Sequence, residues 1–183
     1  MQFSVSIGFA VRKKNILVTG LPGVGKTTLI KKLAHDLRDF NPAGFYTEEI
    51  REGGIRKGFS LASFNGRRGT LSRTDIKSRH TVGKYGVDIA AFEDFLGQIS
   101  FFSPDCRLVI IDEIGKMECI SGEFRKLLNT ILDSERPLVA TISKKGEGII
   151  AETKKRPDIE IFELTQLNRD SLLPVISGRV RSL

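Results

Sequence analysis

The 183-residue chain has no tryptophan, only two cysteines and no run of 18 apolar residues. Cys106 and Cys119 flank an apolar stretch at a spacing that matches no zinc motif, so we expect two half-buried thiols rather than a metal site or a disulfide. The lack of a long apolar run argues against a membrane-spanning helix. The first residues, MQFSVSIGFAVRKK, place their charges after the apolar part, the reverse of a secretory signal. We therefore expect a cytoplasmic protein.

Aromatic residues make up 8% of the chain, and the net charge is +7. A positive field attracts polyanions, including nucleoside triphosphates and nucleic acid. The basic residues are scattered among 22 acidic ones, however, and are not interleaved with aromatic residues as a stacking platform for single strands requires. Charge alone therefore does not favour nucleic acid as the partner.

Apolar strand-like runs alternate with amphipathic helical patterns along most of the chain. This order predicts an α/β fold with a mostly parallel sheet flanked by helices, within a single domain spanning 1–183. Segment 43–82 instead carries Gly-Gly and Asn-Gly turn signals, which predict an antiparallel β-hairpin insertion. Residues 1–14 form an extra segment, either an added edge strand or an unstructured leader. The expected strands are 15–20, 106–115, 136–143 and 159–165, and the expected helices are 26–40, 87–100, 123–133, about 146–155 and one from Asn168.

The stretch GLPGVGKTT at 20–28 fits the pattern G-x-x-x-x-G-K-[ST] between a strand and a helix. Glycines let backbone N–H groups approach phosphate oxygens, and the helix that follows presents its positive end. Lys26 supplies a charge for the β- and γ-phosphates, and Thr27 a hydroxyl for Mg²⁺. The expected nucleotide-binding residues here are Gly20, Leu21, Pro22, Gly23, Val24, Gly25, Lys26, Thr27 and Thr28.

The stretch LVIIDEIGKME at 108–118 places Asp112 at the carboxyl end of a buried strand, where parallel sheets bind ligands. Asp112 is expected to hold Mg²⁺ together with Thr27, and the adjacent Glu113 to orient and deprotonate a water. A kinase gains nothing from a water-activating carboxylate, so the pair favours hydrolysis. About 85 residues separate Lys26 from Asp112, which leaves room for an extra strand between the two motif strands.

Three more polar residues lie near these motifs. Lys116 either contacts the γ-phosphate region or is a solvated loop lysine. Thr141 and Ser143 end the third core strand. If that strand lies beside the Asp112 strand, one of the two hydroxyls senses the γ-phosphate or the water; otherwise the backbone satisfies them.

Further candidates lie in the insertion and near the carboxyl terminus. Arg51 or Arg56 is placed to act as an internal arginine finger on the γ-phosphate. Tyr85 either stacks on a base or packs in a turn. Arg169, at the start of the last helix, is a candidate for binding base, ribose or phosphate.

Five stretches in order, TGLPGVGKTTL, GFYTEEIRE, VGKYGV, LVIIDEIGKME and ELTQLNRD, resemble the small P-loop nucleoside-triphosphatases described from thermophiles, a family with a human cancer-related relative. The resemblance implies a RecA-like fold and slow Mg²⁺-dependent hydrolysis of ATP, GTP, CTP, UTP and TTP to diphosphate and phosphate. It carries phosphate binding to Gly20–Thr28 and the acidic-site role to Asp112 and Glu113. The sequence has no N-K-x-D signature for guanine.

Two other functions stay open at this point. A nucleotide or nucleoside kinase needs a mobile arginine-bearing lid, and the arginines of 51–84 are available for one. An ATP-switched nucleic-acid-binding module predicts stimulation of hydrolysis by nucleic acid and a steep salt dependence. The expected protein is a monomer that acts on nucleoside triphosphates away from membranes.

Overall fold

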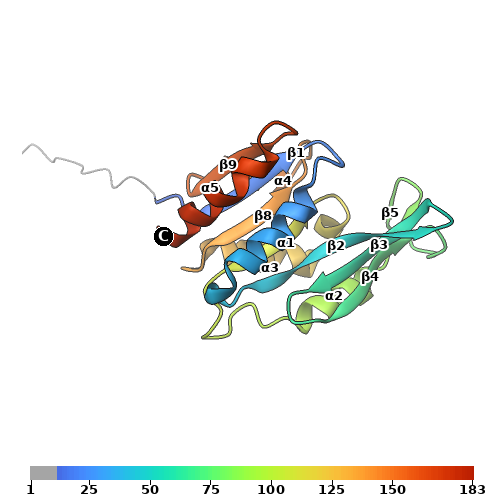
Figure 1. The fold of residues 1–183 in the computed structure, drawn as a ribbon. Helices are drawn as coiled ribbons and strands as arrows, with labels where there is room; N and C mark the ends of the chain where they lie inside the picture. The colour runs from blue at the N-terminus through green and yellow to red at the C-terminus, as the bar shows by residue number, and fades with distance from the viewer. Residues whose placement is uncertain (1–11) are drawn as a thin grey trace, which may run out of the picture.

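One nine-stranded sheet organises the computed structural model, which describes residues 12–183 (Figure 1). Most of the extra N-terminal segment expected at 1–14 lies outside the described residues. The strand order across the sheet is β5-β6-β4-β3-β2-β7-β8-β1-β9. The strands are β1 (Asn15–Gly20), β2 (Ala43–Glu52), β3 (Ile55–Ser63), β4 (Arg68–Arg73), β5 (Thr81–Val82), β6 (Tyr85–Val87), β7 (Val109–Ile114), β8 (Leu138–Ile142) and β9 (Ile159–Leu164).

Helices cover both faces of the sheet, because alternate residues of the central strands are apolar on each side. The helices are α1 (Lys26–Asp36), α2 (Ile89–Gly97), α3 (Gly122–Asp133), α4 (Ile149–Lys155) and α5 (Arg169–Arg181). Helices α1 and α5 pack on one face against Ile16, Val18 and Ile110. Helices α2, α3 and α4 pack on the other face against Leu17 and Ile111. The predicted α/β class, with a parallel core and antiparallel hairpins, is confirmed.

The predicted extra strand between the motif strands is β8, which pairs in parallel with both β7 and β1. It comes from the chain after Asp112, not from the residues between the two motifs. Strand β2 joins the two parts of the sheet, since it pairs in parallel with β7 through Ala43–Phe45 and antiparallel with β3. The antiparallel strands continue to Val87 and extend the main sheet.

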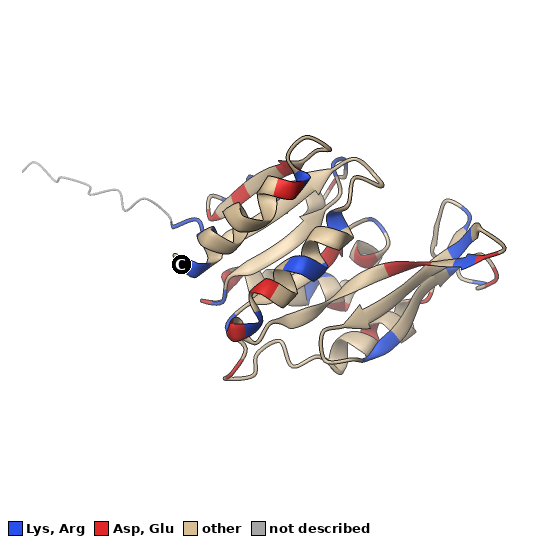
Figure 2. Cartoon of the chain, in the orientation of Figure 1, with Lys and Arg blue, Asp and Glu red and all other residues tan. Residues whose placement is uncertain are grey.

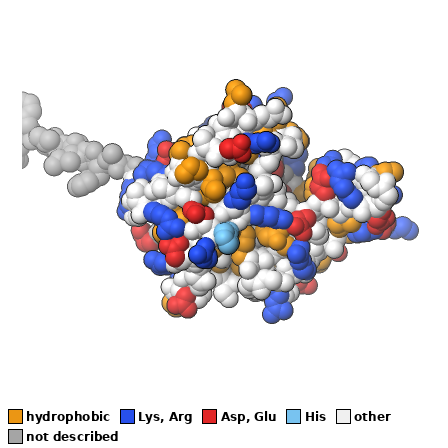
Figure 3. Space-filling view, viewed as in Figure 1, with side chains coloured by type: hydrophobic (Ala, Val, Ile, Leu, Met, Phe, Trp, Pro, Cys, Tyr) orange, Lys and Arg blue, Asp and Glu red, His pale blue; other side chains and the backbone are white. Residues whose placement is uncertain are grey.

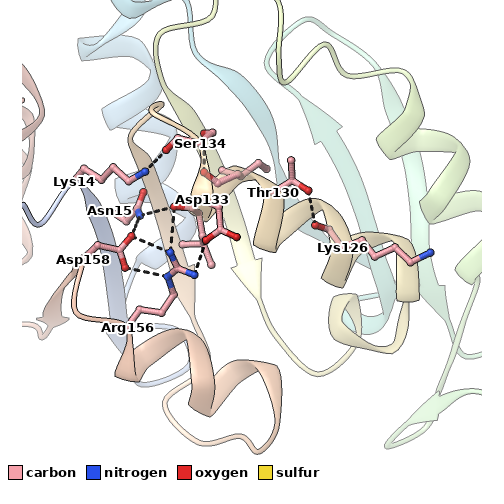
Figure 4. A network of polar contacts seen from close by, with 10 residues as sticks. Lys14, Asn15, Lys126, Thr130, Asp133, Ser134, Arg156 and Asp158 are labelled. Carbon is pink, nitrogen blue, oxygen red and sulfur yellow. Dashed lines mark hydrogen bonds and ion pairs between the residues drawn. The ribbon is translucent and has the colours of Figure 1, made fainter. Parts of the chain in front are cut away.

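A buried polar network anchors the amino end of β1, away from the end that leads into the glycine loop (Figure 4). The Asn15 amide donates to Asp158 Oδ2 at 2.8 Å, and its oxygen accepts from the Leu138 N–H at 3.1 Å. Arg156 bridges Asp158 and Asp133 with contacts of 3.0 and 2.9 Å. The network therefore ties β1 and β8 to the ends of α3 and α4.

Charged residues are sparse in the central strands and frequent on the helices and hairpin tips (Figure 2). On the face that carries α1 and α5, basic and acidic side chains are intermixed (Figure 3). This distribution agrees with the scattered charge expected from the sequence.

Candidate nucleotide-binding site

The loop from Gly20 to Gly25 turns the chain from β1 into α1. Gly23 and Gly25 have φ angles of 77° and 108°, a region that side chains with a Cβ rarely adopt. No side chain caps the start of α1 within the described residues, so its first N–H groups are available for an anion. The Lys26 ammonium lies back over the loop, 3.2 Å from the Gly20 carbonyl oxygen. Loop, helix end and lysine together form a cradle for phosphate.

Asp112 is the fourth of the six residues of β7, is 1% exposed, and accepts hydrogen bonds from two hydroxyl groups. Thr27 Oγ1 donates to its Oδ2 at 2.6 Å, and Thr141 donates to its Oδ1. Burial raises the pKa of Asp112 above its usual range, and the hydrogen bonds from Thr141 and Thr27 oppose that effect. Thr27 and Asp112 thus lie together, and the Thr141 hydroxyl is satisfied by this carboxylate rather than by the backbone.

Glu113 is half-buried and points into the same cavity as Lys26. Ser143 Oγ donates to Glu113 Oε1 at 2.6 Å, which fixes the direction of that carboxylate. The Lys154 ammonium donates to the Ser143 and Lys144 carbonyl oxygens at 2.6 and 2.9 Å and holds the loop after β8 in place. Desolvation lowers the pKa of Lys154. Ser143 therefore lines the cavity itself and also orients Glu113.

Lys26, Thr27, Glu113 and Ser143 line a common cavity of about 810 Å³. Its walls are the glycine loop and first turn of α1, the ends of β7 and β8, and the hairpin of β2 and β3. The hairpin contributes Thr47, Glu48, Glu49, Arg56 and Phe59. The hairpin thus presents two carboxylates, one guanidinium and an aromatic ring to the side of the cavity that faces the phosphate cradle.

Two other predicted residues, Lys116 and Arg169, line neighbouring cavities instead of this one. Lys116 is exposed and lines a separate cavity of about 270 Å³ that shares Glu113 as a wall. Arg169 is exposed and lines a third cavity, of about 450 Å³, with Val24 and Thr28. The third cavity touches the back of the phosphate loop, which is a suitable place for a ribose or base.

The 270 Å³ cavity contains a residue that the sequence analysis missed. Glu118 is 5% exposed, and burial raises its pKa to about 8, with Glu113 and Asp112 adding to the effect. A Cβ built on Gly115 would lie 2.8 Å from Glu118 Oε2 and 3.1 Å from Glu113 Oε1, so both carboxyl groups approach the same glycine. The repeated acids of DEIGKME are the only sequence signal that pointed to this residue.

The oxygen atoms at Thr27 and Asp112 fit a hard cation such as Mg²⁺. Within residues 12–183 there is no cluster of three or more His, Cys, Asp or Glu side chains arranged to hold a metal. Mg²⁺ binds through one or two protein oxygens plus substrate phosphates, and does not need such a cluster. Thr27 and Asp112 are therefore the residues that would hold it. None of the described helices combines the length and the hydropathy that a membrane span requires.

Comparison with known proteins agrees with this geometry. Residues 15–177 match the profile of the family described as NTPase. The nucleoside-triphosphatase THEP1 of Thermotoga sp. (strain RQ2) is 48% identical over 159 residues, which cover 86% of this chain and 90% of that protein. The human cancer-related nucleoside-triphosphatase is 38% identical over 186 residues, covering 92% of this chain and 97% of that protein.

Two solved structures are also similar. The crystal structure of THEP1 from the hyperthermophile Aquifex aeolicus has a TM-score of 0.81 at 36% identity, covering 91% of this chain and 98% of that chain. The solution structure of a human cancer-related nucleoside triphosphatase has a TM-score of 0.77 at 37% identity, covering 92% of this chain and 98% of that chain. The likeness extends over nearly the whole length in both cases.

Proposed function

Because this chain belongs to the NTPase family and is a nucleoside-triphosphatase, we propose that it removes the γ-phosphate of ATP, GTP, CTP, UTP and TTP alike, with Mg²⁺. The products are the nucleoside diphosphate and phosphate. We include in the proposal that it acts as a cytoplasmic monomer and without nucleic acid. The observation that carries the proposal is Glu113, which Ser143 orients at 2.6 Å within the cavity that Lys26 lines.

Several residues of the cavity, together with the buried Asp112, have separate tasks in this reaction. The backbone N–H groups of the loop and the Lys26 ammonium bind the phosphates and stabilise the charge that develops on the γ-phosphoryl oxygens. Glu113 orients a water for in-line attack and accepts its proton. Ser143 keeps Glu113 in position for that step. Thr27 and Asp112 would hold Mg²⁺, which neutralises charge on the β- and γ-phosphates when bound.

The broad base range is supported by the residues near Arg169. The cavity beside the phosphate loop is lined by Val24, Thr28, Lys32, Leu164 and Arg169, among others. A long, exposed cation and apolar side chains contact any base by stacking and charge, whereas selection of one base needs buried donors and acceptors that match its edge. The sequence has no N-K-x-D signature to supply them.

The test measures phosphate release and nucleotide binding on the same protein samples. Glu113→Gln should lower turnover by about 10²-fold or more, because an amide cannot take the proton from water. Binding of a fluorescent ATP analogue should change little, since Lys26 and the loop are intact. Ser143→Ala should lower turnover less, and Thr19→Ser serves as a control substitution on β1. Normal hydrolysis by Glu113→Gln would show that Glu113 is not the base.

The same assay separates the two other functions that the sequence left open. Release of phosphate without any acceptor supports a hydrolase. ATP consumption that appears only with an added nucleoside or nucleotide would support a kinase. Hydrolysis that appears only with RNA or DNA, and falls steeply with salt, would support a nucleic-acid-dependent switch.

A further inference from the structure

The hairpin of β2 and β3 carries an arginine to the wall of the phosphate cavity. Arg56 is the second residue of β3 and lines the 810 Å³ cavity together with Lys26 and Glu113. Among the described residues of that wall it is the single arginine; the other cations are Lys26, Lys144 and Lys145. It lies on the hairpin, not on the phosphate loop, so it approaches the cavity from the opposite side.

Arg56 is positioned by its neighbours and still has donors to spare. Its Nε donates to the Tyr85 hydroxyl at 3.0 Å, and its Nη1 donates to Glu49 Oε1 at 2.7 Å. The guanidinium lies over the Phe59 ring, 5.2 Å from its centroid. A guanidinium has five N–H donors, and within the described residues these two hydrogen bonds use two of them. The Tyr85 and Glu49 hydrogen bonds raise the pKa of Arg56, so the group stays charged.

Arg56 can break its ion pair with Glu49 and still leave the Glu49 carboxylate paired. Arg51 also binds Glu49, with its Nε 2.8 Å and its Nη2 2.6 Å from Oε2. If Arg56 turns toward a more negative group, Arg51 remains on Glu49. A bound triphosphate is such a group, and the planar guanidinium fork matches two phosphate oxygens at once.

We infer that Arg56 is a catalytic residue, which leaves Glu49 when a nucleoside triphosphate binds and contacts the γ-phosphate. This inference rests on the proposed hydrolysis. Charge builds on the γ-phosphoryl oxygens during transfer, and an arginine supplied there accelerates the step by about 10³- to 10⁵-fold in other phosphoryl-transfer proteins. Tyr85 and Phe59 act as positioning residues, because they hold the guanidinium plane beside the cavity before substrate arrives.

The structure separates Arg56 from Arg51, which the sequence left as equal candidates. Arg51 Nη1 donates to the Gly54 carbonyl oxygen in the hairpin turn at 2.8 Å, and its side chain is 56% exposed. It does not line the phosphate cavity. Both arginines pair with Glu49 and carry the same charge, so Arg51→Ala is a matched control for Arg56→Ala.

The experiment compares kcat at saturating Mg²⁺-ATP for the full-length wild type, Arg56→Ala, Arg56→Lys and Arg51→Ala, with ADP affinity measured in parallel. Arg56→Ala should lower kcat at least about 100-fold. Its ADP affinity should stay within about 3-fold of the wild type, because ADP lacks the γ-phosphate. Arg51→Ala should keep kcat within about 3-fold. Arg56→Lys keeps the charge but not the planar guanidinium fork, and its kcat should lie between those of Arg56→Ala and Arg51→Ala.

Further variants and controls decide how the result is interpreted. Glu49→Gln weakens the hold on Arg56 and should raise kcat, and a loss comparable to that of Arg56→Ala would contradict the inference. If Arg56→Ala fails to fold, the kcat of Arg56→Lys is compared with that of the wild type instead. An active wild type with equal kcat in Arg56→Ala, or an equal loss in Arg51→Ala, would overturn the role of Arg56 alone. An inactive wild type would overturn the proposed hydrolysis and this inference with it.

Discussion

Replacement of Glu118 by glutamine is expected to stabilise the folded protein at neutral pH. The carboxyl group lies in the turn after β7, is 5% exposed, and faces the Glu113 carboxylate across Gly115. The other titratable groups near it are Asp112, the Cys119 thiol and the exposed Lys116. Burial, with Glu113 and Asp112 in addition, raises the pKa of Glu118 from its ordinary 4.5 to about 8.

The sign and size of the effect follow from proton linkage. Below pH 4.5 Glu118 is protonated in both the folded and the unfolded chain, so its ionisation does not lower the free energy of unfolding. Between pH 4.5 and about 8 the unfolded chain loses the proton while the folded chain keeps it, so the free energy of unfolding falls as pH rises. At 1.36 kcal/mol for each pH unit, the loss at pH 7 is about 3 kcal/mol. Glutamine resembles the neutral carboxyl and does not titrate.

The assay is urea unfolding of wild type and Glu118→Gln at pH 5, 6, 7 and 8, without nucleotide or Mg²⁺. The advantage of the variant should grow steadily with pH and reach about 3 kcal/mol at pH 7. Glu123→Gln is the control, because Glu123 is 61% exposed and, among residues 12–183, its ion pair is with Lys126 on the surface. An advantage that is constant from pH 5 to pH 8 would show that Glu118 is not held neutral in the folded protein.

Three other substitutions test separate parts of the account. Gly44→Ala should lower the free energy of unfolding by about 3 kcal/mol or more in urea, because φ is 145° and the new Cβ would lie 1.8 Å from the Ile110 carbonyl oxygen; a loss under about 1 kcal/mol would contradict this packing. Asn15→Ala should cost about 1–3 kcal/mol in the same assay, since it leaves the buried Leu138 N–H without an acceptor and removes one donor to Asp158, which keeps its contacts with Arg156. Asp112→Asn should weaken Mg²⁺-dependent nucleotide binding by about 10-fold or more in titration calorimetry and leave Mg²⁺-free binding unchanged; equal losses with and without Mg²⁺ would argue against a metal-holding Asp112.

The local parts of the site were predictable from the sequence. The strand, glycine loop and helix around Lys26 are continuous in the chain, and each residue type there has a conformational or charge requirement. Asp112 follows a strongly apolar strand, so its position at the carboxyl end of the sheet follows from the pattern. The helix bounds were predicted less well: the helix expected at 26–40 ends at Asp36.

The partners of these residues were not predictable, because they come from distant segments. Ser143 orients Glu113 across 30 positions, and Tyr85 holds Arg56 across 29. These contacts depend on the order of strands in the sheet, and in particular on β8 lying beside β7. Nothing in the local pattern around Glu118 indicated burial, because its short turn folds the carboxyl back beneath Gly115.

The most direct test of the central claim is phosphate release from ATP, GTP, CTP and UTP with Mg²⁺ and no acceptor, by wild type and Lys26→Ala. The account predicts release from all four nucleotides by the wild type and loss of release in the variant, since Lys26 lies at the phosphate cradle. Nucleotide bound by the wild type without any phosphate release would contradict it.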